Sequence, residues 1–380
     1  MRRTRIFDAV KRSIQRSDLL NALANVIWYR KRLGYLEYVN GYFTNPEIVQ
    51  IQPGTDGWDD EKGQRRPICL IETWNKTQGF AAGLREALDG IYFCRRYGFQ
   101  PFIRFHEDSL YKDEIFPETM NPFEYFFETE SIRNEVFAIS PQVIYHPRNR
   151  VMAEQLTHSK RDYGTSEEYI SAMAKIWGRD IRLKQDIQDL TDELISEKGI
   201  GSDCLGVHFR GTDFKVRYYN HPIYVSLEEY YPYIEEAMRT DHFSKIFIAT
   251  DDIDALHELI RHLGEDRVIY DETLTRISGT NGVHTSFSSG FKNGLDVLKD
   301  MSALAACGGL ISGASKVAQI ARIIKKSKGQ EYTYDKYLFK GIVEYGKVFD
   351  IKGDNPVTGR CKKCIQMEDN HIIGERRTGA

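Results

Sequence analysis

The run GVHFRGTD, from Gly206 to Asp213, has the residue types of an anion site at the end of an apolar stretch. Alternate residues of an extended chain share one face, so His208 and Arg210 point the same way, and Gly211 lets the chain turn sharply. The arginine guanidinium offers a planar set of donors with a permanent charge, which is the geometry that a diphosphate needs. The alternative is an ion pair between Arg210 and Asp213 that only holds the turn.

A second apolar run, 246–250, ends in the acidic pair Asp251 and Asp252. An aspartate at a strand-to-helix junction is well suited to cap the helix, here one that starts at Ile253. The alternative is a metal-binding pair, for which the neighbouring sequence offers no evident third oxygen ligand.

The run GLISGASKV, from Gly309 to Val317, predicts a strand, a turn of small residues and a helix that starts near Ser315. Small residues let backbone amides approach a phosphate, and a helix N-terminus adds partial positive charge. The run is not a Walker loop, because the Gly-x4-Gly-Lys spacing is absent. A plain tight turn capped by Ser315 is the alternative.

A fourth candidate is Asp300, which lies in a predicted helix one turn after Asp296. A carboxylate there could accept two hydrogen bonds from the edge of a guanine base, whereas adenine lacks the matching donors. The alternative is that the two aspartates form a solvated stripe.

Strands alternate with helices around these motifs. We expect strands at 204–210, 245–250, 267–270 and 309–312, and helices at 227–238, 253–263, 294–306 and 315–326. This alternation predicts a parallel sheet with right-handed crossovers, in which ligands bind beyond the carboxyl ends of the strands. An earlier α/β unit is expected from a strand at 67–72, a helix at 80–97 and a strand at 99–105, followed by a helix-rich region, 107–200, that includes 117–128.

Composition excludes several classes of protein. With 380 residues, 41% of them hydrophobic, the chain can form about two globular domains. Its 52 basic residues nearly balance 55 acidic ones, so no global positive field favours nucleic acid. Cysteines such as Cys69 and Cys94 lie in apolar runs, which indicates reduced core thiols and a reducing compartment.

The two ends of the chain differ from its centre. Residues 1–66 predict an amphipathic helical extension with a basic polar face, followed by a polar loop. Within it, residues 1–32 could dock on the protein or contact an anionic membrane surface, but they form neither a signal peptide nor a membrane span, so we expect a cytoplasmic protein. Residues 351–380 predict a flexible tail, in which Cys361 and Cys364 supply only two of the four ligands of a zinc site.

The order of the motifs resembles that of the fucosyltransferase superfamily, most closely its alpha-1,6-fucosyltransferase and bacterial nodulation group. The resemblance covers about residues 68–105 and 202–326, and its pieces are the HxRxTD run from His208, then His221-Pro222, then 248–252, Asp300 and the turn at Ser315. It implies an α/β fold of the GT-B type: two Rossmann-like domains facing across a cleft, an acceptor domain at 67–200 and a donor domain at 201–350. It also implies metal-independent, inverting transfer of fucose from GDP-fucose to a glycan or glycolipid hydroxyl, with no cofactor.

Residue roles follow from the same resemblance. Arg210 is expected to hold the donor diphosphate, His208 and Asp300 to contact the nucleoside, and Ser315 to touch phosphate. The residues expected to order the motif loops or contact the donor are Thr212, Asp213, Asp251 and Asp252. From the first domain, Gln78 and Gly79 are expected to line the cleft.

The sequence departs from the family at two positions. Gly211 stands where members often have a second arginine, and Tyr218 stands where better-studied members have a glutamate proposed as the general base. We therefore expect Asp213 to be the base, with His221 and the glutamates 228 and 229 as further candidates. Two other functions stay open: transfer from another GDP-sugar, and a catalytically silent nucleotide-binding scaffold.

Overall fold

The computed structural model describes residues 68–73, 78–97, 100–106, 109–129, 143–146, 166–215, 221–240, 243–279 and 289–343. The predicted N-terminal extension and the predicted tail lie outside these residues. Within the described ranges, no helix is both long and apolar enough to cross a membrane.

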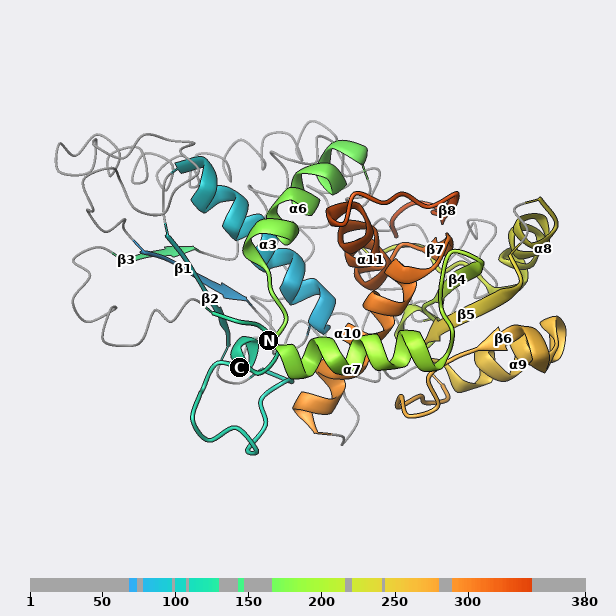
Figure 1. The fold of residues 1–380 in the computed structure, drawn as a ribbon, viewed down its shortest axis with the longest axis horizontal. Coiled ribbons are helices and arrows are strands. Elements are labelled where there is room, and N and C mark those ends of the chain that lie inside the picture. Colours follow the sequence, from blue (N-terminus) through green and yellow to red (C-terminus); the bar gives the residue numbers. More distant parts are fainter. Residues whose placement is uncertain are drawn as a thin grey trace, which may run out of the picture.

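Two parallel sheets organise the chain (Figure 1). The first has the order β2-β1-β3 and consists of Ile68–Thr73 (β1), Gln100–Phe105 (β2) and Val143–His146 (β3). The second has the order β6-β5-β4-β7-β8 and consists of Cys204–Phe209 (β4), Lys245–Thr250 (β5), Val268–Ile269 (β6), Gly309–Gly313 (β7) and Tyr334–Leu338 (β8). All pairs of neighbouring strands run parallel. The predicted α/β class is confirmed.

Helices connect the strands and cover the sheets. The α-helices are Phe80–Tyr97 (α3), Glu167–Asp180 (α6), Gln185–Glu197 (α7), Tyr231–Thr240 (α8), Ile253–Leu263 (α9), Gly290–Ala306 (α10) and Lys316–Ser327 (α11). Single turns of 3-10 helix occur at Pro122–Tyr125 (η1), Asp213–Lys215 (η2), Leu227–Glu229 (η3) and Glu265–Arg267 (η4).

Both faces of the second sheet are buried, which is why its strands read as nearly continuous apolar runs. On one face, Leu205 and Val207 of β4 pack in a core with Ile234 of α8 and Leu256 of α9. On the other face, Cys204 belongs to a core that includes α10 and α11. The helices thus alternate between the two faces of the sheet, as in a doubly wound fold.

One hydrophobic core joins the two sheets. It contains Ile71 and Phe105 from the first sheet together with Phe247 and Leu310 from the second. In Figure 1, α10 and α11 lie between the sheets, and α3 approaches them from the first half of the chain. Three buried cysteines in the described ranges, Cys94, Cys204 and Cys307, form no disulfide, as expected.

The N-terminal end of α10 is fixed to the first half of the chain. The Asp113 carboxylate accepts hydrogen bonds from the Ser289 hydroxyl and, at 3.1 Å, from the Phe291 backbone N–H. At Gly294 an added Cβ would lie 2.5 Å from the Phe126 ring, so only glycine allows this close packing. Because Asp300 lies on the same helix, these contacts also set its position.

The structure corrects three of the expected elements. The range 117–128 holds only the single turn η1, because Asn121 caps it and also bonds to the β2 backbone, at Ile103 O and Phe105 N. Helix α10 starts at Gly290 rather than 294, since the Ser289 hydroxyl caps it. The helix expected at 227–238 is divided into η3 and α8, and β3 and β8 were not expected.

Helices α6 and α7 lie in the range predicted for the first domain, yet they pack mainly against α11 and α10 of the second half. A charged contact accompanies the first pair, since Lys326 of α11 lies 2.5 Å from Glu167 of α6. The division into two domains with a boundary at residue 200 stays a prediction.

Candidate functional site

The predicted motifs meet where the order of the second sheet reverses. The chain winds outward from β4 through β5 to β6, and then returns to the other side of β4 with β7 and β8. In open parallel sheets, ligands bind outside the carboxyl ends of the strands at this switch point. Here Arg210 follows β4, Asp251 follows β5, and Ser315 follows β7 at the start of α11.

His208 joins the three strand ends. Its Nδ1 lies 3.0 Å from the carbonyl oxygen of Ala249 on β5, and its Nε2 lies 2.6 Å from the Ser315 hydroxyl. Because a carbonyl only accepts, Nδ1 carries the proton and Nε2 accepts from the serine. Ser315 also accepts a hydrogen bond from the Val317 N–H at 3.2 Å, so the same hydroxyl caps α11.

Burial lowers the pKa of His208 to about 4, and the charges of Arg210 and Arg322 act in the same direction. The imidazole is therefore neutral at physiological pH. Both ring nitrogens bond to protein groups, so His208 orients Ser315 and the start of α11. A contact with the nucleoside stays a prediction, and in this arrangement it would be made through the carbon atoms of the ring.

We expect His208 to make the protein sensitive to mild acid. Below its ordinary pKa the unfolded chain takes up a proton there that the folded chain does not, so stability is present above about pH 6.5 and is lost toward pH 4. Between pH 7.5 and 5 the wild-type protein should lose about 2 kcal/mol more unfolding free energy than His208→Gln. Urea denaturation at both pH values measures this, and equal losses in the two proteins would contradict it.

Asp251 holds the turn that carries Arg210. Its Oδ1 accepts from the Gly211 N–H at 3.0 Å, and its Oδ2 accepts from the Thr212 hydroxyl at 2.6 Å and lies 3.3 Å from Arg210 Nε. The Arg210 side chain is 24% exposed, so a ligand can reach it. The role predicted for Asp213 concerns a side chain outside the described part of the structure, and it stays a prediction.

Asp252 has a structural role, which is the capping alternative that the sequence left open. Its Oδ1 accepts from the N–H groups of Asp254 and Ala255 at the start of α9, at 3.1 and 3.3 Å. Its Oδ2 lies 2.5 Å from Lys215 Nζ, so this lysine charge is balanced by a fully buried carboxylate. No group of three or more potential metal ligands occurs in the described ranges, and metal independence stays a prediction.

Gly211 is required by its contact with Asp252. A Cβ at position 211 would lie 2.8 Å from Asp252 Cγ and closer still to its Cβ and Oδ2. The second arginine that family members often have at this position does not fit here without displacement of the α9 cap.

Gly211→Ala should therefore destabilise the protein by about 3 kcal/mol, because overpacking and a lost helix cap act together. Gly79→Ala is the matched control, since a Cβ there has no neighbour within 4 Å. Thermal unfolding should show a fall of several degrees for the first variant and no change for the second. A Gly211→Ala protein as stable as the wild type would show that the turn can move away from Asp252.

Asp300 is not part of a solvated stripe. Its neighbour Asp296 pairs with Lys292 at 2.7 Å, whereas Asp300 Oδ1 is buried and has no hydrogen-bond partner among the described residues. Burial raises the pKa of Asp300 to about 8, although the charge of Arg276 lowers it. A carboxyl group in this state would gain from a ligand that donates hydrogen bonds.

The other predicted residues lie as follows. Gly79 accepts the first backbone bonds of α3, at 3.0 and 3.3 Å, and Gln78 precedes it. His221 is exposed, its ring centroid lies 6.2 Å from that of Phe214, and its carbonyl accepts from Val343 N at 2.8 Å. Neither arrangement tests the roles predicted for these residues.

No protein-family model matches the sequence, and no curated protein does. Among solved structures, the chain is similar to NodZ alpha-1,6-fucosyltransferase co-crystallized with GDP, at 19% identity and a TM-score of 0.45, over 68% of this chain and 92% of that one. It is also similar to fucosyltransferase NodZ from Bradyrhizobium (18% identity, TM-score 0.39, 68% and 92% covered) and to POFUT1 in complex with GDP-fucose (10%, 0.34, 74% and 99%).

Two residues near the site, Tyr111 and Arg276, could not be predicted from the sequence. Tyr111 from the first half of the chain is buried within the electrostatic range of Arg210, and the Phe80 backbone at the start of α3 bonds its phenol group. Burial raises the pKa of Tyr111, so it stays a neutral phenol. Arg276 approaches from the segment after β6. Neither residue belongs to a recognisable motif, since tertiary packing alone brings them here.

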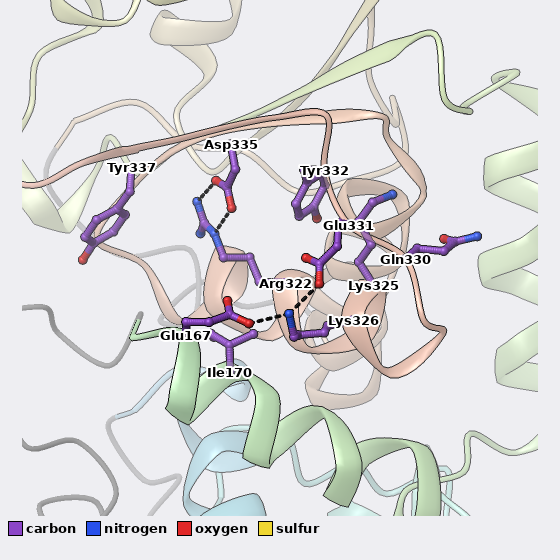
Figure 2. A pocket seen from close by; sticks show the side chains of 10 residues that line it. All are labelled: Glu167, Ile170, Arg322, Lys325, Lys326, Gln330, Glu331, Tyr332, Asp335 and Tyr337. Carbon is purple, nitrogen blue, oxygen red and sulfur yellow. Dashed lines mark hydrogen bonds and ion pairs between the residues drawn. The ribbon is translucent and has the colours of Figure 1, made fainter.

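A cavity of about 320 Å³ lies elsewhere, between α6, α11 and the segment before β8 (Figure 2). Five of its charged side chains pair with one another, and the sixth, Lys325, donates to the carbonyl oxygens of Ala305 and Cys307 at 3.2 and 2.8 Å. Arg322 bonds both carboxylate oxygens of Asp335, at 2.9 and 2.6 Å, and Lys326 lies 2.5 Å from Glu167 and from Glu331. Because these charges are balanced, we do not place the anion site in this cavity.

Proposed function

We propose that this protein is an inverting glycosyltransferase that moves fucose from GDP-fucose to a hydroxyl group of a glycan or glycolipid. One observation carries the proposal. At the switch point of one parallel sheet, a reachable arginine follows β4 and a helix N-terminus follows β7, and Asp300 of α10, within electrostatic range of Asp251 after β5, has an Oδ1 that is buried without a partner among the described residues. GDP requires such groups: positive groups for its diphosphate and a hydrogen-bond acceptor for its guanine base.

Arg210 and the start of α11 would bind the diphosphate. The leaving GDP gains negative charge as the sugar bond breaks, and preorganised positive groups stabilise that charge in the transition state. Asp251 fixes the turn after β4, and His208 with Ser315 fixes the helix end, so neither group has to reorganise during the reaction. This arrangement supplies the electrostatic part of the catalysis from the protein alone.

Asp300 would select the base. Guanine presents N1–H and N2–H donors on one edge, which an ionised carboxylate can accept together, and adenine does not. Binding of guanine would also supply the partner that the buried Oδ1 lacks within the described ranges.

The choice of fucose and the rest of the reaction rest on the motif order. Asp213 is proposed as the base that takes the acceptor proton, so that the hydroxyl attacks from the face opposite the leaving GDP. The first half of the chain, 67–200, would bind the acceptor. A cytoplasmic role in polysaccharide or glycolipid assembly, with residues 1–32 at the membrane surface, completes the proposal.

Release of GDP from GDP-fucose, followed in EDTA with and without a panel of glycan acceptors, tests the proposal. We expect release from GDP-fucose to exceed release from GDP-mannose by at least tenfold, and Asp213→Asn to lose most of it. Equal use of GDP-mannose would favour a different GDP-sugar. Binding of GDP without release from either donor would favour the silent scaffold.

A further inference from the structure

The loop between β6 and α10, residues 271–277, places a second charged side chain near Asp300. This loop is tied to the end of β5, because the N–H of Ile277 donates to the carbonyl oxygen of Asp251 at 3.1 Å and its carbonyl accepts from Ile253 N at 3.2 Å. It therefore lies directly beside the predicted nucleotide site.

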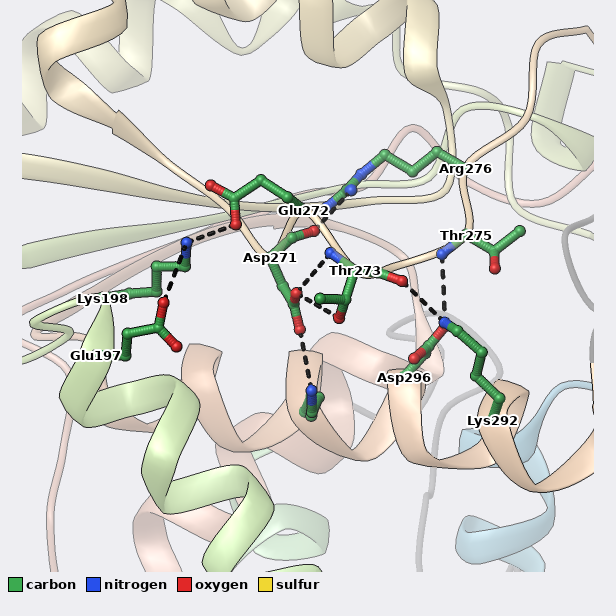
Figure 3. Close-up of polar contacts among 10 residues, drawn as sticks. Glu197, Lys198, Asp271, Glu272, Thr273, Thr275, Arg276, Lys292 and Asp296 are labelled. Atoms are coloured by element: carbon green, nitrogen blue, oxygen red, sulfur yellow. Dashed lines mark hydrogen bonds and ion pairs between the residues drawn. The ribbon is translucent and has the colours of Figure 1, made fainter.

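The same loop is also fixed to α10 (Figure 3). Lys292 donates to the Thr273 carbonyl oxygen at 2.9 Å, the Thr275 N–H lies 3.4 Å from Asp296 Oδ2, and Lys299 lies 3.4 Å from Asp271 Oδ2. Contacts to two elements hold the loop in one place, and α10 is the helix that carries Asp300.

Arg276 uses only some of its guanidinium donors within this loop. Its Nη1 donates to the Asp271 carbonyl oxygen at 2.8 Å, as Figure 3 shows, and the group lies over the Tyr270 ring at 5.3 Å. Its Nε and Nη2 are buried and have no hydrogen-bond partner in the described ranges. Buried polar groups normally have partners, so these two donors require one.

Arg276 lies near Asp300, because the neighbouring Thr275 contacts Asp296, one turn before Asp300, and Lys299 of the same helix pairs with Asp271 of the loop. The charge of Arg276 acts on Asp300 more than that of any other residue, yet the side chains make no direct ion pair. Nε and Nη2 form one edge of the guanidinium and donate in parallel, while the carboxyl group accepts. A ligand that fits between them must present acceptors on one side and donors on the other.

We propose that Arg276 and Asp300 form the two sides of a guanine pocket, in which Arg276 donates to O6 and N7 and Asp300 accepts from N1 and N2. The inference rests on the proposed function and adds a residue that determines base specificity. An arginine paired with O6 and N7 is the commonest specific contact of proteins with guanine in DNA, and the same donor geometry fits the free base. O6 and N1 are adjacent on the base, so the two side chains contact guanine without contacting each other.

Binding of 7-deaza-GDP, which lacks the N7 acceptor, tests the contact by titration calorimetry. The wild-type protein should bind it about tenfold more weakly than GDP, because one hydrogen bond to a charged donor is lost. Arg276→Met, which keeps much of the side-chain volume, should bind the two nucleotides equally. Arg267→Gln removes an exposed arginine of η4 and should keep the tenfold difference.

The outcomes separate this inference from the proposed function. If the tenfold difference persists in Arg276→Met, or is absent in the wild type, a water or the loop itself is the partner of Arg276 and the inference is wrong. If the wild type does not bind GDP, the proposed function fails as well. Should Arg276→Met not fold, Arg276→Leu, which likewise carries no hydrogen-bond donor, should also lose the difference.

Discussion

Arg210→Ala is expected to weaken GDP binding by at least about 100-fold and to reduce turnover of GDP-fucose by about 1000-fold. The guanidinium is the permanent cation at the end of β4, and the diphosphate gains charge during the reaction. Arg210→Lys should recover only a fraction of the loss, because an ammonium group cannot bond two phosphate oxygens in a fixed plane.

The fold should tolerate this change. Asp251 keeps its bonds to the Gly211 N–H and the Thr212 hydroxyl when the arginine is removed. Calorimetry with GDP and a turnover assay measure the effect, and Arg239→Ala, which removes an exposed arginine of α8, is the control. A variant that binds GDP as the wild type does would place the diphosphate elsewhere.

Asp300→Asn should have two opposite effects, a more stable protein and the loss of GDP binding. The groups that act on this carboxyl group are Arg276 and Asp271 from the loop, Asp296 on its own helix and Asp251 after β5. Burial outweighs the arginine charge and raises the pKa to about 8. Between its ordinary pKa and this value the folded protein binds a proton that the unfolded chain does not, so stability falls as pH rises.

Asparagine carries no charge at any pH, so it removes the free-energy cost of burying an ionisable carboxyl group at position 300. At pH 7 we expect Asp300→Asn to gain about 1–3 kcal/mol in unfolding free energy, and to gain less at pH 4.5. The amide donors would face the donors of guanine, so GDP affinity should fall by about 100-fold. Wild-type affinity should rise from pH 6 to 8, as the carboxyl group ionises, and the affinity of the variant should stay flat. A variant that is less stable yet binds GDP normally would exclude the proposed role.

The sequence predicts the second sheet well because each of its central strands is buried on both faces. The apolar runs at β4, β5 and β7 are nearly continuous, and a glycine or a capping residue follows each one. The edge strand β8 was not expected, because Tyr334–Leu338 has neither a continuous apolar run nor a period-two alternation, and its pairing with β7 depends on tertiary contacts.

The structure also differs from the sequence prediction where tertiary contacts override the local preference of the chain. The buried aromatic residues near 123–127 have a spacing that favours a helix, but the helix ends after one turn because the backbone of Phe126 and Glu128 pairs with residues 182–184. The sequence also places His208 and Arg210 on one face as two ligand-binding side chains. In the fold the histidine has both nitrogens bonded to protein groups, which no sequence pattern reveals.

For the candidate site, the sequence predicts which residues lie at the strand ends, but it does not predict what each of them does. Asp251 and Asp252 are adjacent, yet one holds the motif turn and the other caps α9. Tyr111 and Arg276 approach the site from loops, where spacing carries no information about position.

Titration of the purified protein with GDP, UDP and ADP in EDTA tests the central claim, that the carboxyl ends of β4, β5 and β7 form a guanine diphosphate site. We predict that GDP binds at least about 100-fold more tightly than UDP or ADP, a difference of about 2.7 kcal/mol. Equal affinity for the three nucleotides, or no binding of GDP, would contradict it.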